Sequence, residues 1–122
     1  MTVRVLVVDD QNPFRQAMSA VVEATDGFQV VGTAASGEES VVACRRLLPD
    51  LVLMDVNLPG IDGVAATRLV RALPSPPVVL LLSTYDADAA DGFLAACGAA
   101  AYLTKSELGP DRLTAAWSAA TS

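Results

Sequence analysis

Hydrophobic positions along the chain fall into five short apolar runs, separated by segments in which apolar residues recur at helical spacing. The runs are Val3–Val8, Phe28–Thr33, Leu51–Met54, Val78–Leu82 and Ala99–Leu103. Short apolar runs bounded by turn residues are typical of strands that are covered on both faces. Strands that alternate with helices predict βαβ units with right-handed crossovers, and therefore an α/β fold in which a parallel sheet lies between two layers of helices.

Five further segments carry helix start and stop signals. They begin at Asn12-Pro13, Ser36-Gly37, Asp62-Gly63, about Asp86 and Gly109-Pro110, and they end near Gly27, Leu48, Leu73, Gly98 and Trp117. Ser36 and Glu39 have the spacing of a capping box, and the two prolines stand where a first helical turn tolerates them. In the helix after Asp62-Gly63, the residues expected to face inward are Val64, Ala65, Leu69 and Val70 or Leu73.

Polar residues follow the strands in a pattern that the fold makes meaningful. Because ligands of open parallel sheets bind outside the carboxyl ends of the strands, residues just after each strand are expected to meet at one edge. These residues are Asp9 and Asp10 after the first strand, Asp55 at the end of the third, Ser83 and Thr84 after the fourth, and Lys105 after the fifth. The sequence therefore predicts three carboxylates, one or both of these hydroxyl groups, and an ammonium group at one edge.

This combination of groups suits phosphoryl transfer. Carboxylates that lie close together raise one another's pKa unless a cation is present, and Mg²⁺ accepts a few carboxylates while keeping room for a phosphoryl group. The Lys105 ammonium and the Ser83 hydroxyl could each bind an anionic oxygen, and an aspartate can act as the nucleophile that forms an acyl phosphate. Positioning and charge neutralisation are most of what phosphoryl transfer requires of a protein.

Composition narrows the alternatives. A chain of 122 residues has the length of one domain, and its net charge of −6 argues against direct binding of nucleic acid. The absence of histidine excludes serine–histidine and cysteine–histidine nucleophilic machinery and most zinc sites. No apolar run approaches the roughly 20 residues of a membrane span, and the N-terminus lacks the cleavage site of a signal peptide. Cys44 and Cys97 suggest neither a disulfide framework nor a metal site, which favours buried thiols in a cytoplasmic protein.

The chain resembles the receiver domain of bacterial two-component response regulators along essentially its whole length. Four signatures carry the resemblance: Val5–Asp10, Asp55–Gly63, the hydroxyl residue Ser83 after the fourth strand, and Gly98–Lys105. The residues Ser83–Asp86 and Gly98–Lys105 resemble most the receivers of the NarL/LuxR-type subgroup. The resemblance implies a flavodoxin-like three-layer α/β/α fold, with a five-stranded parallel sheet in the order 2-1-3-4-5.

The resemblance also implies a role for each site residue. Asp55 would be the phosphoacceptor, and Asp10, Asp55 and the main-chain carbonyl of Asn57 would bind Mg²⁺ with help from Asp9. Lys105 and Ser83 would bind the phosphoryl oxygens. Ser83 would also act with Tyr102 as a switch. The chain would then catalyse only its own phosphorylation and dephosphorylation, and would not be an enzyme acting on other molecules.

Partners follow from the same resemblance. A sensor histidine kinase, or a small acyl phosphate, would donate the phosphoryl group. The face built from the fourth helix, the fifth strand and the last helix (Asp86–Trp117) would signal onward or form a homodimer. Residues 1–122 are expected to form one receiver domain, with no effector domain in this chain; a stand-alone receiver and the front part of a DNA-binding regulator both remain open. The partners expected for this chain include neither a membrane nor nucleic acid.

Three positions depart from the family pattern. Ser106 stands where many receivers have a proline, which leaves the geometry of the Lys105–Ser106 peptide open, since a cis bond before a non-proline residue costs about 2.5–4 kcal/mol. Ser83 replaces the more usual threonine. Tyr85 is bulky and lies close to the expected approach of hydrolytic water, which predicts slow loss of the phosphoryl group that Tyr85→Ala would accelerate.

Rival interpretations remain at this stage. Asp9 and Asp10 could form a solvated turn, Lys105 could be a surface residue, and Tyr102 could simply pack against the last strand. The chain could be a degenerate receiver that serves as an interaction module without taking up phosphate. An aspartyl-phosphate phosphatase is a weaker alternative, because it needs a second acid two residues after the nucleophile, where this chain has Asn57.

Overall fold

The structure is a computed structural model, and it describes residues 2–84 and 97–122. Five strands form one sheet in the order β2-β1-β3-β4-β5, and all four neighbouring pairs are parallel. The strands are β1 (Val3–Val8), β2 (Phe28–Ala34), β3 (Leu51–Asp55), β4 (Val78–Ser83) and β5 (Ala101–Thr104). The helices are α1 (Asn12–Glu23), α2 (Gly37–Leu47), α3 (Gly63–Arg71) and α5 (Pro110–Thr121), and a short 3₁₀ helix, η2, spans Lys105–Glu107. The expected fold class and strand order are confirmed.

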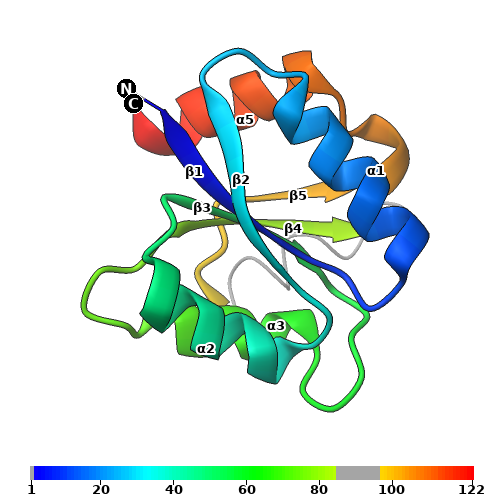
Figure 1. Ribbon diagram of the computed structural model, residues 1–122. Helices are drawn as coiled ribbons and strands as arrows, with labels where there is room; N and C mark the ends of the chain where they lie inside the picture. The colour runs from blue at the N-terminus through cyan, green and yellow to red at the C-terminus, as the bar shows by residue number, and fades with distance from the viewer. Residues whose placement is uncertain (1, 85–96) are drawn as a thin grey trace.

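The helices cover the sheet in two layers, with α1 and α5 on one face and α2 and α3 on the other (Figure 1). Successive residues of a strand point to opposite faces, so each central strand supplies both cores. In β3, for example, Leu51 and Leu53 pack with Met18 of α1 and Leu113 of α5, whereas Val52 and Met54 belong to the opposite cluster. The continuous apolar runs of the sequence are therefore explained by burial on both sides.

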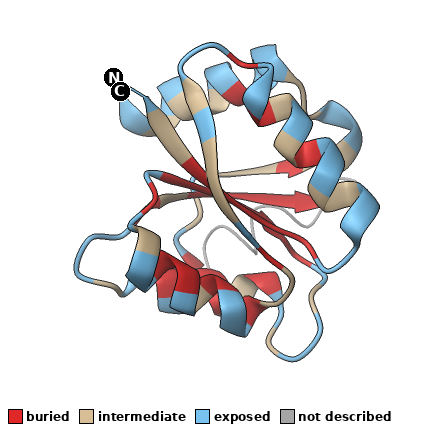
Figure 2. Cartoon of the chain, in the orientation of Figure 1, coloured by how far each residue is buried: buried red, intermediate tan, exposed pale blue. Residues whose placement is uncertain are grey.

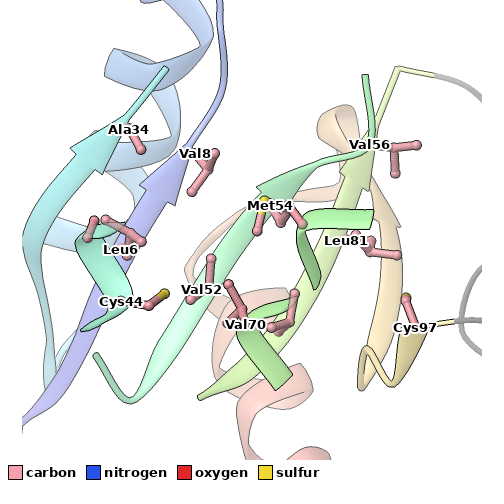
Figure 3. Close-up of a cluster of buried hydrophobic side chains, with 13 residues drawn as sticks. Leu6, Val8, Ala34, Cys44, Val52, Met54, Val56, Val70, Leu81 and Cys97 are labelled. Carbon is pink, nitrogen blue, oxygen red and sulfur yellow. The ribbon is translucent and has the colours of Figure 1, made fainter. Parts of the chain in front are cut away.

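The cluster under α2 and α3 contains both cysteines. Figure 3 shows Cys44 and Cys97 among the apolar side chains of this cluster. Burial raises the pKa of the Cys44 thiol to about 11, which keeps it protonated at neutral pH. The central strand β3 is buried throughout, β1 and β4 are buried except at their first residues, and exposed residues are concentrated on the outer faces of the helices and in the loops (Figure 2).

Several boundaries differ from the expected ones. Helix α1 ends at Glu23 rather than near Gly27, because Ala24 closes its last turn and a separate turn leads into β2. Strand β5 begins at Ala101 rather than Ala99, and α5 continues past Trp117 to Thr121. Ser36 does cap α2, since its side chain accepts a hydrogen bond from the Glu39 N–H.

The prediction for the inward face of α3 is correct at Val70, which is buried, and at Val64 and Leu73, which pack against the same cluster, but it is wrong at Leu69. Leu69 is 50% exposed, whereas the buried positions are Gly63, Ala66, Thr67 and Val70. These four positions have the i, i+3, i+4, i+7 spacing of one helix face. Gly63 has no side chain and Thr67 is polar, so neither residue type predicts a core position. The helix lies close to the end of β3, and that close approach is possible only through its small residues.

Three further expectations concern particular segments. The Lys105–Ser106 peptide is trans, as are the other peptide bonds of the described residues. Among those residues, the structure holds no helix long and apolar enough to cross a membrane. Tyr85 and most of the expected fourth helix (residues 85–96) lie outside the described residues, and so does that part of the expected signalling face.

Candidate phosphoacceptor site

The strand register brings the expected site residues to one edge of the sheet. Val8 is paired with Met54, so Asp9 follows β1 beside Asp55 at the end of β3. On the other side, Asp55 is paired with Leu82, and Ser83 is paired with Thr104 at the ends of β4 and β5. The chain from β5 then enters η2, whose first residue is Lys105.

The three aspartates form one cluster. Asp9, Asp10 and Asp55 each have a carboxylate oxygen within 4.8 Å of the other two. Asp9 is fully buried and Asp55 is 3% exposed, whereas Asp10 faces solvent. A main-chain N–H donates to each buried carboxylate: Gln11 to Asp9 Oδ1 at 2.9 Å, and Asn57 to Asp55 Oδ1 at 3.2 Å. These turns fix which carboxylate oxygens are left to meet a ligand.

Lys105 places its ammonium group among these carboxylates. Its Nζ lies 2.7 Å from Asp9 Oδ2 and 3.4 Å from Asp55 Oδ2. Within the part of the chain that the structure describes, no group donates a hydrogen bond to Asp9 Oδ2, so the ion pair with Lys105 is what compensates its charge. The turn that carries Lys105 is held by a capping box, in which the Thr104 N–H donates to Glu107 Oε1 at 3.0 Å. That capping box orders the loop at the position where Ser106 replaces the proline of many receivers.

The surroundings of Asp55 oppose its ionisation. Burial and the negative charge of Asp9 raise its pKa from 3.8 to about 6, although Lys105 and the Asn57 N–H act in the opposite direction. The Lys105 ammonium therefore does not offset the burial of Asp55 and its repulsion by Asp9. The carboxylates would compensate the positive charge of an added cation. Oxygen donors of this kind suit a hard divalent ion.

This pKa makes a prediction for stability. The folded protein binds a proton at Asp55 more tightly than the unfolded chain does, so the free energy of unfolding falls as the pH rises from about 3.8 to 6 and does not recover above that. Asp55→Asn does not titrate. Without metal, we expect it to be more stable than the wild type by about 1–3 kcal/mol at pH 7.5, with the gain vanishing near pH 4.

Urea unfolding in EDTA-containing buffers across this pH range would measure the difference. The exposed Asp26, in the loop at the opposite edge of the sheet, offers a matched control in Asp26→Asn. A gain that is the same at every pH would contradict the assigned cause, because a purely steric or hydrogen-bonding effect does not follow the titration of Asp55.

A hollow of about 290 Å³ opens over the cluster. Its lining residues are Asp10, Gln11, Phe14, Asp55, Asn57, Thr84 and Lys105. The volume can hold a small anion together with a hydrated cation, and its walls combine carboxylates with one ammonium group. Of the two hydroxyl residues after the fourth strand, Thr84 lines the hollow and Ser83 lies buried at the end of β4.

The remaining expected residues are placed as follows. Asn57 is exposed and lines the hollow. Tyr102 is half-buried on β5 and packs against the cluster under α2 and α3.

Phe14, near the start of α1, was not predicted as a site residue, but it lines the hollow. Its apolar side chain favours a core position, and nothing in the sequence indicates that the site end of α1 and its core-facing side meet at this residue.

Comparisons with known proteins agree with this geometry. Residues 5–118 match the family model of the response regulator receiver domain. The response regulator GacA of Pseudomonas viridiflava is 47% identical over 104 residues, which cover 84% of this chain and 48% of that protein. The chain thus spans about half the length of the curated relatives of this kind that it matches.

Solved structures show the same similarity in three dimensions. The signal receiver domain of NarL from Mycobacterium tuberculosis is 32% identical, with a TM-score of 0.88 over 98% of this chain and 97% of that one. The response regulator domain of CheB from Thermotoga maritima is 26% identical, with a TM-score of 0.87 over 100% of this chain and 98% of that one.

Proposed function

Since the chain belongs to the response regulator receiver domains, whose role is that of a phosphoacceptor in two-component signalling, we propose that Asp55 is the acceptor residue of this one. The observation that carries the proposal is the meeting of Asp55 with Asp9, Asp10 and the Lys105 ammonium at one edge of the sheet. These residues come from both ends of the chain and from its middle. A surface turn or a chance ion pair would not bring together four charged residues so distant in the sequence.

The proposed reaction assigns each residue a task. An Asp55 carboxylate oxygen attacks the phosphorus atom, forming an O–P bond, while the bond from phosphorus to the donor's nitrogen or oxygen breaks and the donor keeps the electron pair. Asp55 must be ionised to attack, and its pKa of about 6 satisfies this at neutral pH. Lys105 lies 3.4 Å from the attacking carboxylate, which is close enough for its ammonium group to pair with a phosphoryl oxygen when the phosphoryl group reaches Asp55.

Mg²⁺ fits the oxygen donors of this site. Asp10, Asp55 and the main-chain carbonyl of Asn57 would hold the ion, with Asp9 assisting, and the ion would neutralise negative charge on the phosphoryl oxygens. The fit rests on the buried, mutually repelling carboxylates and the raised pKa of Asp55.

The proposed metal site makes its own prediction. Mg²⁺ at about 100 times its dissociation constant should stabilise the wild type by about 2.7 kcal/mol, because it binds the folded protein only. Asp10→Asn removes a donor from the exposed side of the cluster, and we expect it to lose most of this stabilisation. Asp26→Asn should retain it. Thermal unfolding with and without Mg²⁺ measures the difference, and equal stabilisation of all three proteins would show that the ion binds elsewhere.

The wider role follows from the family. We propose that residues 1–122 form one receiver domain, that a phosphohistidine of a sensor kinase donates the phosphoryl group in the cytoplasm, and that Ser83 and Tyr102 pass the change to β5 and α5. These two residues lie on neighbouring strands, which supports a shared response. Solution mass with and without BeF₃⁻ and Mg²⁺ would test whether the response includes formation of a homodimer.

Incubation with acetyl phosphate and Mg²⁺ tests the proposal as a whole. We expect a phosphorylated protein that requires both the metal and Asp55. A degenerate receiver, the principal alternative, would show neither an adduct nor any dependence on Mg²⁺.

A further inference from the structure

Phe14 lies against the Lys105 ammonium group. The Lys105 Nζ is 4.0 Å from the centroid of the Phe14 ring, on which a cation is attracted by the negative face of the π system. The same nitrogen faces Asp9 and Asp55, and the Lys105 side chain is only 11% exposed. The Lys105 ammonium therefore contacts two carboxylates and the face of an aromatic ring at the same time.

Beyond the ring there is space. An apolar cavity of about 360 Å³ lies beside the site, lined among others by Ala17, Val21 and Leu108, and Phe14 and Lys105 border both this cavity and the hollow over Asp55. Without the ring, the flexible lysine stem would have a second direction available, away from Asp55.

The ring is held in place by the start of α1. Pro13 stands in the first turn of the helix, and Arg15 donates from Nη1 to the main-chain oxygen of Asp9 at 2.8 Å and from Nη2 to Asn12 Oδ1 at 3.2 Å. The residue after Phe14 is thus tied to the strand end that carries the carboxylate partner of Lys105. Ring and carboxylate are anchored to each other.

From these contacts we infer that Phe14 is a positioning residue for the phosphoryl-binding lysine, holding the Lys105 ammonium beside Asp55 through the face of its ring. The inference rests on the proposed function, because it concerns the same site. It adds a requirement that the acidic cluster alone does not contain: an aromatic ring, rather than any apolar side chain, at position 14.

Replacement of the ring by an aliphatic side chain tests this requirement. Phe14→Leu keeps an apolar residue but removes the attraction for the cation, and we expect phosphoryl uptake from acetyl phosphate to slow about 3- to 10-fold. Mg²⁺ affinity should stay unchanged, because no metal donor is altered. Phenylalanines with increasing numbers of ring fluorines at position 14 should slow uptake in graded steps, since fluorination weakens the negative face at nearly constant size.

Lys105 is the only lysine in the chain, so isotope-labelled lysine gives a single set of side-chain NMR signals. Ring currents from Phe14 should shift the signals of the Lys105 terminal methylene, and Phe14→Leu should abolish that shift. Phe28→Leu is the matched control: Phe28 is equally half-buried but stacks edge-on with Trp117, so its loss should change neither the signals nor the uptake rate.

The outcomes separate the two proposals. Normal uptake and unchanged Lys105 signals in Phe14→Leu overturn this inference and leave the proposed function standing. Slow uptake in the Phe28→Leu control to the same degree also overturns it, because a general loss of packing would then be the cause. A wild-type protein that takes up no phosphoryl group overturns the proposed function, and this inference with it.

Discussion

Phosphoryl uptake from acetyl phosphate should fall by about 100-fold when Lys105 is replaced by alanine, because removing one preorganised group that stabilises developing charge costs about that much. Lys105 is the one lysine of the sequence, and its ammonium group lies 3.4 Å from Asp55 Oδ2. A phosphoryl group that approaches Asp55 in the variant meets two further carboxylates without that compensation. Quenching the reaction at successive times and measuring the fraction of phosphorylated protein by intact-mass spectrometry would give the rate.

The affinity of Lys105→Ala for Mg²⁺ should not fall together with its rate of phosphoryl uptake. Loss of the ammonium leaves the cluster more negative, so a divalent cation should bind as tightly as in the wild type or more tightly. Arg112→Ala provides the control, because this exposed cation forms its one ion pair within residues 2–84 and 97–122 with Glu107, at 3.4 Å. A parallel loss of Mg²⁺ binding and uptake in Lys105→Ala would indicate a disrupted site and would argue against the specific role given to the lysine.

Gly63→Ala should destabilise the protein by about 3 kcal/mol, at the upper end of what overpacking costs. A methyl group there would overlap the main-chain oxygen of Asp55 and would lie 2.8 Å from the Cα of Val56. Both are backbone atoms, and the Gly63 N–H is bonded to the Val56 oxygen at 2.8 Å, so neither side can yield without moving the other. The strand end that carries Asp55 would be displaced, and uptake should fall as well.

Urea unfolding measures the loss, with Gly109→Ala as the control. A methyl group at Gly109 meets no atom within 4 Å, so that variant should lose less than about 1 kcal/mol, the usual cost of alanine at a helix N-cap. Equal stability of the two variants would show that α3 can withdraw from β3, and that the close approach is not required.

The fold could be predicted from the sequence because the apolar runs, the helix periodicity and the capping residues all indicate the same elements. Apolar runs such as Leu51–Met54 are buried on both faces, and Ser36 and Asp62 cap helices where their spacing indicates. Leu69 shows where this reasoning ends. The rotation of α3 is set by the contact of Gly63 with the backbone of β3, and a glycine in the sequence gives no sign of what will lie against it.

The candidate site was predictable to a similar extent and for a related reason. Parallel strands bring their carboxyl ends to one edge, so Asp9, Asp55 and Lys105 could be grouped before any distance was known. Which of these side chains contact one another could not be predicted. The direct contact of Lys105 with Asp9, and the Phe14 ring above the ammonium, depend on the turn of η2 and the position of α1, which are tertiary features.

One measurement tests the central claim most directly, namely the location of the phosphoryl group. The protein is treated with acetyl phosphate and Mg²⁺, the acyl phosphate is reduced with borohydride, and the modified residue is mapped by peptide mass spectrometry. We expect modification at Asp55 alone, and none in Asp55→Asn or in the presence of EDTA. Modification at Asp9, Asp10 or any other residue of the wild type, or no modification at all, would contradict the assignment of Asp55 as the phosphoacceptor.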